Sequence, residues 1–260
     1  MPTPSLCRSA VLTALLVLGA LAVLLVPGGG SPALRGTTGG AATVDSRLGP
    51  DAGIRASAAG PGYAFSAVLD GRPVRWNPCA PVRWTANLSG APAGGLAVLR
   101  AAVARVAAVS GTTWTYVGPT TTRPTSAVLP RSSRATYPPV VIGWTDGAAS
   151  DLLRGQPRST LAMTRTAWFG VQKPDGSKVA ALRSAVIALD RTDRLPLRGA
   201  VSWQAVALHE LGHAMGLAHV GDTRQLMATV LPRTVTDLQR GDRAGLVKVG
   251  RPAGCVVVPG

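Results

Sequence analysis

Three histidines and one glutamate are the residues of this 260-residue chain whose types and spacing could do chemistry together. The sequence has no other histidine and no other glutamate, and all four lie between positions 209 and 219. Their pattern is H-E-x-x-H-x-x-G-x-x-H. Two histidines four positions apart project from one face of a helix, one turn above the other, so His209 and His213 can place two imidazole nitrogens on one metal ion.

The third histidine requires a change of chain direction, because a straight helix cannot bring position 219 to the point that positions 209 and 213 share. Gly216 lies just before it and has no Cβ. It can therefore take the left-handed conformation that ends a helix and lets the chain return with His219. We predict that His209, His213 and His219 bind one zinc ion, which prefers such nitrogens in a roughly tetrahedral arrangement.

Three protein ligands leave one zinc position for water, whose pKa zinc lowers to about 7. Glu210 follows the first ligand and can accept the proton of this water and pass it to a leaving amine. The predicted chemistry is metal-assisted amide hydrolysis. An amphipathic helix with ordinary histidines is one alternative, but the third histidine and Gly216 disfavour it. A purely structural zinc site is another, but such sites usually have four protein ligands.

The complete motif resembles the signature of the metzincin clan of zinc endopeptidases, which a Met-turn completes. Met227 lies eight residues after His219. Its surroundings, residues 225–229, are similar to the Met-turn of matrixins, in which a methionine lies beneath the three-histidine site. The alternative for Met227 is ordinary core packing.

Other segments resemble matrixins in the same order along the chain. Residues 160–163 are similar to the edge strand that pairs with an extended substrate, which implies that Leu161 and Ala162 are substrate-strand residues. Residues 237–246 resemble the start of the matrixin C-terminal helix. Residues 76–84 are similar to the domain start of secreted bacterial matrixin-like proteins. We expect residues 228–233 to form a wall of the pocket that selects the residue after the scissile bond.

The sequence differs from animal matrixins in three respects. They carry a second, structural zinc bound largely by histidines, and this chain has no histidine left for one. Their calcium loops are not recognisable, so Ca2+ binding stays open. The candidate Ca2+ ligands are aspartates scattered along the chain, and their role in hairpin turns explains their presence equally well. They are Asp146, Asp151, Asp175, Asp190 and Asp193. The cysteine-switch propeptide is missing, although the residues around Cys79 resemble it faintly.

Periodicity and turn signals predict the secondary structure. Strands are expected over residues 63–68, 74–76, 82–87, 112–117, 140–144, 161–169 and 179–189. Helices are expected over residues 92–109, 202–217 and 236–249, and a long loop over 119–139. This order predicts an α+β domain, or an α/β one. The resemblance, which covers roughly residues 72–250, implies a twisted, mostly parallel sheet with an active-site helix and a C-terminal helix.

The first 26 residues are predicted to be an export signal or a membrane anchor. Residues 10–26 are apolar and uncharged, and Arg8 precedes them. A Gly/Ala/Pro-rich segment, residues 27–62, is interpreted as a flexible linker, and residues 63–260 as the catalytic domain. The protein is then secreted, or anchored with its domain outside the cytoplasm. In that oxidising compartment we expect Cys79 and Cys255 to form a disulfide; latency through Cys79 is the alternative.

The net charge of +15 leaves two interpretations. One is attraction to an anionic surface such as cell-wall polymer, and the other is a coding bias towards arginine. Aromatic residues make up only 4% of the chain and basic runs are short, so nucleic-acid binding is not expected. Protein or peptide substrates and a monomeric state are expected. The competing hypothesis is a non-catalytic, zinc-stabilised surface module that binds anionic cell-wall polymer.

Overall fold

The computed structural model of the chain describes residues 55–60, 62–130, 137–173 and 175–258. The predicted export signal or anchor, residues 1–26, lies outside these residues, as does most of the predicted linker. Among the described residues, no helix has both the length and the apolar character needed to cross a membrane.

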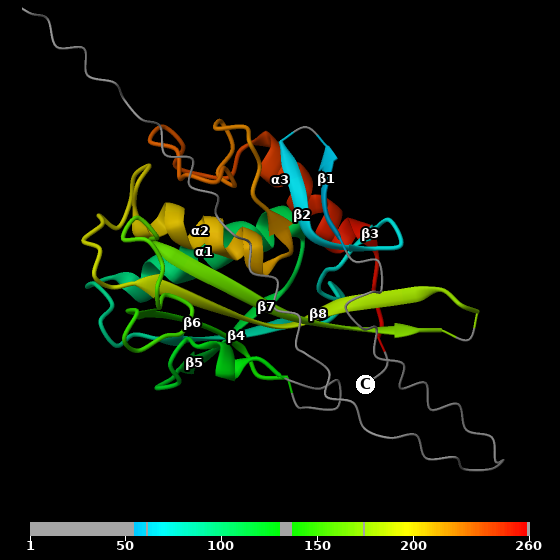
Figure 1. Cartoon of the computed structure of the whole chain (residues 1–260), viewed down its shortest axis with the longest axis horizontal. Helices are drawn as coiled ribbons and strands as arrows, with labels where there is room; N and C mark the ends of the chain where they lie inside the picture. Colours follow the sequence, from blue (N-terminus) through cyan, green and yellow to red (C-terminus); the bar gives the residue numbers. More distant parts are fainter. Residues whose placement is uncertain (1–54, 61, 131–136, 174, 259–260) are drawn as a thin grey trace, which may run out of the picture.

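A five-stranded sheet forms the centre of the fold, with strand order β5-β4-β6-β8-β7 (Figure 1). All neighbouring pairs are parallel except β7 with β8, which form a long antiparallel hairpin. The mostly parallel sheet is thus confirmed. Its strands are β4 (Val82–Asn87), β5 (Trp114–Pro119), β6 (Val140–Thr145), β7 (Ala162–Gln172) and β8 (Lys178–Asp190).

Helices α1 (Gly95–Ser110) and α2 (Trp203–Ala214) pack against each other on one face of this sheet (Figure 1). All six residues of β6 are buried. Such a continuous apolar run is typical of a parallel strand covered on both faces. On the second face, Val141 and Val186 pack against Leu152 and Leu153 of the loop that follows β6. The third helix, α3 (Arg240–Val249), packs against α1.

A smaller sheet lies beside the helices. It contains β1 (Arg55–Gly60), β2 (Tyr63–Leu69), β3 (Arg72–Pro73) and β9 (Leu217–Ala218). Asp70 and Gly71 form the turn between β2 and β3, and both residues have positive φ, 48° and 73°, as a type I′ turn requires. Two predictions about this region are wrong. Strand β1 lies inside the segment interpreted as a linker, and the returning strand is β3 at Arg72–Pro73, not residues 74–76.

All three predicted helices are longer than those observed. Helix α1 begins at Gly95, because Gly94 has a left-handed conformation with φ 83°. Helix α2 ends at Ala214, because Gly216 has φ 102° and turns the chain out of the helix. Helix α3 begins at Arg240, where Gln239 and Asp242 form a capping box. Periodicity did not locate these ends, since apolar residues continue beyond each of them.

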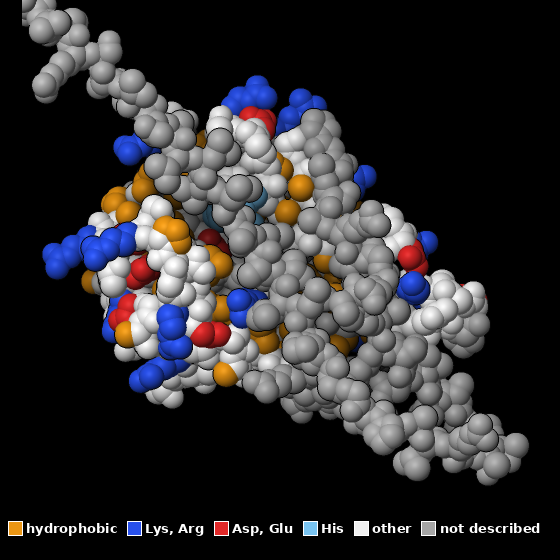
Figure 2. Space-filling model, in the orientation of Figure 1, with side chains coloured by type: hydrophobic (Ala, Val, Ile, Leu, Met, Phe, Trp, Pro, Cys, Tyr) orange, Lys and Arg blue, Asp and Glu red, His pale blue; other side chains and the backbone are white. Residues whose placement is uncertain are grey.

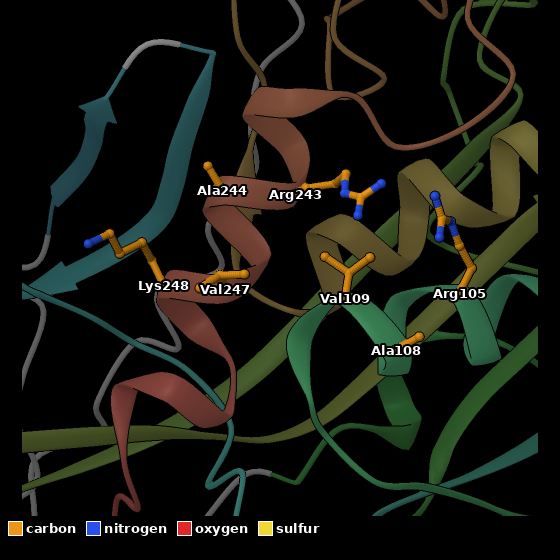
Figure 3. Close-up of a pocket in the computed structure, with 7 residues that line it drawn as sticks. All are labelled: Arg105, Ala108, Val109, Arg243, Ala244, Val247 and Lys248. Carbon is orange, nitrogen blue, oxygen red and sulfur yellow. The ribbon is translucent and has the colours of Figure 1, made fainter.

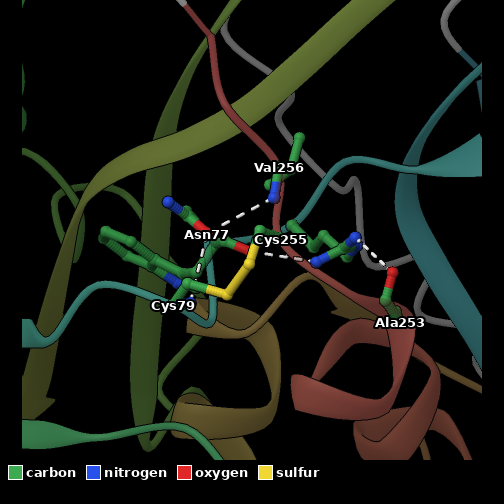
Figure 4. Close-up of a disulfide and its surroundings, with 7 residues drawn as sticks. Asn77, Cys79, Ala253, Cys255 and Val256 are labelled. Carbon is green, nitrogen blue, oxygen red and sulfur yellow. Dashed lines mark hydrogen bonds between the residues drawn. A yellow bond between two sulfur atoms is a disulfide. The ribbon is translucent and has the colours of Figure 1, made fainter.

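A disulfide joins Cys79 to Cys255, as predicted (Figure 4). It links the segment before β4 to the C-terminal segment, and it excludes a free Cys79 thiol for latency. The oxygen Oδ1 of Asn77 accepts hydrogen bonds from the backbone N–H groups of Cys79 and Val256, at 3.1 and 3.3 Å. The two chain segments are therefore connected by the disulfide and by the hydrogen bond from Val256 to Asn77.

Replacing both Cys79 and Cys255 with serine is expected to lower the free energy of unfolding by about 2–4 kcal/mol. The bond joins residues 176 positions apart, and its loss returns conformational freedom to the unfolded chain. Urea denaturation of the variant and the wild type measures the difference. A reducing agent should destabilise the wild type by a similar amount and leave the variant unaffected. Equal stability of the oxidised wild type and the variant would contradict the expectation.

Candidate active site

The three histidines of the motif converge on one point. His209 and His213 project from α2, and His219 follows β9. Their Nε2 atoms lie 3.1 Å apart in each of the three pairs. Zinc–nitrogen bonds of about 2.0–2.1 Å at tetrahedral angles separate two ligand nitrogens by about 3.3 Å. The cluster therefore fits a zinc ion. Among the described residues, these three histidines are the one group of His, Cys, Asp or Glu side chains that lie close enough together to hold a metal.

The opposite ring nitrogens fix how the imidazoles are oriented. Nδ1 of His209 donates to the carbonyl oxygen of Leu226 at 2.7 Å, and Nδ1 of His213 donates to that of Leu217 at 2.9 Å. With the proton on Nδ1, the lone pair on Nε2 is free for a metal. Burial, together with the neighbouring histidines, lowers the pKa of each of the three to about 4. The rings are therefore neutral at physiological pH, as metal binding requires.

The turn between the second and third histidines depends on Gly216. Its φ of 102° lies in the region that favours glycine. A Cβ at this position would also lie 2.9 Å from the carbonyl oxygen of Val74. Both the conformation and the available space exclude other residues, and the turn that we predicted from the motif is present.

Glu210 is buried beside the histidines. Its Oε2 accepts a hydrogen bond from Oγ1 of Thr164 on β7 at 2.6 Å. Burial raises the pKa of Glu210, while His213 and the hydrogen bond from Thr164 act in the opposite direction. The sequence did not single out Thr164, because its contact with Glu210 spans 46 positions and has no local pattern.

Met227 lies against the active-site helix, buried at 1% exposure. A Cβ built on Gly212 would collide with its Sδ atom, so the methionine touches the helix directly between the first two histidines. The segment also returns to the third histidine, because the N–H of Val220 donates to the carbonyl oxygen of Met227 at 2.9 Å. Met227 thus occupies the position expected of the Met-turn residue.

Asp242 of α3 holds the Met-turn, a role that the sequence did not reveal. Its buried carboxylate accepts hydrogen bonds from the N–H groups of Leu226 at 2.8 Å, Met227 at 3.1 Å and Gln239 at 2.7 Å. In return, Oε1 of Gln225 accepts from the N–H of Gly241 at 2.8 Å. The Met-turn and the first turn of α3 therefore satisfy each other's backbone donors. The carbonyl of Leu226 in the same segment orients His209.

The predicted substrate-strand residues lie at the start of β7, the edge strand next to Glu210. Ala162 pairs with Leu189 as the first residue of the strand, and the carbonyl oxygen of Leu161 accepts from the N–H of Asp190 at 2.9 Å. On its other side, β7 pairs with no strand among the described residues. Figure 2 shows parts of the histidine side chains at the surface of this face.

Four of the five aspartates that we considered for Ca2+ accept hydrogen bonds from protein groups in turns and loops. Asp146 forms an ion pair with Arg191, Asp151 accepts from Ser126, and Asp175 accepts from Ser177. Asp190 accepts from Thr192, whereas the buried Oδ2 of Asp193 has no hydrogen-bond partner among the described residues.

A separate hollow of about 430 Å³ lies between α1 and α3 (Figure 3). Arg105, Arg243 and Lys248 surround a floor of alanine and valine side chains, and none of the lining residues belongs to the histidine cluster. Arg105 is already paired with Asp237 at 2.7 Å.

Comparison with known proteins agrees with the geometry. The family model described as matrixin matches residues 140–249, which include α2, the Met-turn and α3. The chain is a matrixin-like metzincin. Together with the three-histidine cluster, the match assigns this matrixin-like chain to the zinc metallopeptidases. A search of curated proteins finds no match to it.

Proposed function

We propose that this matrixin-like protein is an extracellular zinc endopeptidase in which Glu210 is the general base. The observation that carries the proposal is the convergence of three Nε2 atoms, 3.1 Å from one another, beside a buried glutamate. When bound, zinc lowers the pKa of a water molecule to about 7 and polarises the carbonyl that is attacked. His209, His213 and His219 would hold the ion.

Glu210 is well placed to move a proton. Thr164 donates to its Oε2, which leaves the other carboxylate oxygen available to accept a proton from water. Burial raises the pKa of Glu210, so the carboxylate binds a proton more readily than an exposed one. A base with a raised pKa is also a suitable acid for the leaving amine.

The edge of β7 that pairs with no strand among the described residues supports an extended peptide as the substrate. A peptide that lies along this edge can pair with backbone groups of β7, starting beside Leu161 and Ala162. The predicted pocket wall at residues 228–233 follows the Met-turn, and Val230 within it is 78% exposed. Its side chain is accessible to contact an apolar substrate residue after the scissile bond.

The extracellular location is supported by the disulfide between Cys79 and Cys255. Such bonds persist in oxidising compartments and are rare in the cytosol.

Metal removal tests the function. The full chain, incubated with a diverse peptide library, is expected to cleave internal peptide bonds. A zinc chelator should lower the rate at least about 100-fold, because the ion supplies the activated water, and added zinc should restore it. Mass spectrometry of the products measures both the rate and the preference. Cleavage that persists after complete removal of zinc would overturn the mechanism. A zinc-loaded chain that cleaves nothing but binds cell walls in a salt-sensitive manner would support the non-catalytic alternative.

A further inference from the structure

The hairpin at residues 63–76 contacts the turn that carries the third histidine, although it lies outside the residues that match the matrixin family. Strand β2 pairs antiparallel with β9, through Ala64 with Ala218 and Phe65 with Leu217. His219 is the next residue after β9. The backbone that leads into the third ligand is therefore one strand of a β-ladder, and β2 is the other.

The hairpin also provides hydrogen bonds where α2 ends. The last carbonyl groups of a helix have no partner within the helix and require one elsewhere. The indole Nε1 of Trp76 donates to the carbonyl oxygen of Ala214, the last residue of α2, at 2.8 Å. The carbonyl oxygen of Gly216 accepts from both the N–H and the Oγ of Ser66, at 2.9 and 3.1 Å.

These contacts lie at the two ends of the turn between the second and third histidines. Ala214 is adjacent to His213, and Gly216 is the residue where the chain reverses. Ala214, Gly216 and Trp76 are all buried. If the indole N–H of Trp76 is lost, water has little access to donate to the carbonyl oxygen of Ala214 in its place.

Trp76 is itself firmly held. Its ring packs edge-on against Trp114, with ring centroids 6.4 Å apart. The next residue, Asn77, accepts from the backbone of Cys79 and Val256, and the disulfide at Cys79 follows (Figure 4). The indole is therefore held by the active-site helix and by Trp114, and the backbone that follows it is attached to the C-terminal segment.

We propose that Trp76 and Ser66 are positioning residues for His219, so that the N-terminal hairpin completes the metal site. Neither residue is one of the three candidate metal ligands. Their effect is to hold the turn in the one geometry that brings the third Nε2 to the other two. The inference rests on the proposed function only in that the three histidines bind a metal.

Zinc affinity of the full chain tests the proposal without any measurement of hydrolysis. Trp76→Phe removes the indole N–H and keeps an aromatic ring in the core. Competition with a chromophoric chelator is expected to show zinc binding about tenfold weaker than in the wild type, within the range found when hydrogen-bonding partners behind metal ligands are lost. The visible absorption of the Co2+-substituted variant should also change, because it reports the ligand geometry.

Trp114→Phe is the matched control. It removes an indole hydrogen bond, to Oγ1 of Thr112 at 3.1 Å, from the ring that packs against Trp76. It is expected to destabilise the fold but to leave the zinc affinity and the Co2+ spectrum as in the wild type. If Trp76→Phe shows unchanged zinc affinity and only the stability loss of Trp114→Phe, the proposal is wrong.

Ser66 provides a second test that disturbs the core less. Ser66→Ala removes one of the two donors to Gly216 and is expected to weaken zinc binding by less than the roughly tenfold loss in Trp76→Phe, because the N–H of residue 66 still donates. Ser66→Thr keeps the hydroxyl and should restore the affinity. Unchanged affinity in Ser66→Ala would exclude this residue from the positioning role. The two levels of failure can be distinguished: a wild type without zinc binding contradicts the proposed function, whereas a zinc-binding, active wild type with variants of equal affinity contradicts only this inference.

Discussion

Replacing Glu210 with glutamine is expected to lower kcat/KM for peptide cleavage by about 10²–10⁴-fold, the usual contribution of a general acid–base group. Glutamine has nearly the same shape and can still accept the hydrogen bond from Thr164 through its amide oxygen. It cannot take up the proton of the attacking water. The three histidines are unchanged, so the variant should bind zinc as the wild type does.

Two measurements separate loss of the base from loss of the site. Zinc content and zinc affinity should equal those of the wild type, and kcat/KM on the best library peptide should fall. Asp175→Asn makes the same carboxylate-to-amide change in the turn between β7 and β8, where Asp175 accepts from Ser177, and should leave kcat/KM unchanged. Undiminished cleavage by Glu210→Gln would exclude Glu210 as the base.

The metal-binding part of the site could be predicted from the sequence because it is local. His209 and His213 are one helical turn apart, and Gly216 marks the place where the chain must reverse to return with His219. Each of these inferences depends on neighbouring positions and on backbone geometry alone. The structure brings the three side chains together as the spacing predicts.

The residues that support the site could not be predicted in the same way. Thr164 reaches Glu210 from a strand 46 positions earlier, and Trp76 reaches Ala214 across 138 positions. No periodicity connects such pairs, since their contact depends on how β7 and the N-terminal hairpin pack against α2. Asp242 belonged to a segment recognised only as the start of a helix, and its three backbone donors became evident from the packing.

The same distinction applies to the fold. Apolar runs and turn signals placed β4, β6 and β8 well, because buried parallel strands have a strong local pattern. Strand β9 was missed and assigned to the end of a helix. It has only two residues, and it is a strand because β2 lies beside it. Short strands of this kind are determined by their partner rather than by their own sequence.

Replacing Asp242 with alanine is expected to lower the free energy of unfolding by about 3–6 kcal/mol. The carboxylate accepts from three backbone N–H groups, of Leu226, Met227 and Gln239, and each buried donor left without a partner costs about 1–3 kcal/mol. This is a large part of the total stability of a typical domain, about 5–15 kcal/mol. Asp242→Asn should have a smaller effect, because its amide oxygen can still accept while its NH2 group opposes the remaining donors.

Urea denaturation of the metal-free proteins measures this loss directly, and Asp237→Ala is the control. Asp237 forms an ion pair with Arg105, but its side chain is 39% exposed, and such surface pairs contribute about 1 kcal/mol or less. If the two alanine variants lose the same stability, the Met-turn does not depend on Asp242. If Asp242→Ala is much less stable, zinc affinity should fall as well. The carbonyl that orients His209 belongs to Leu226, whose N–H is one of the three donors, so the carboxylate holds both the fold of the Met-turn and the orientation of the first ligand.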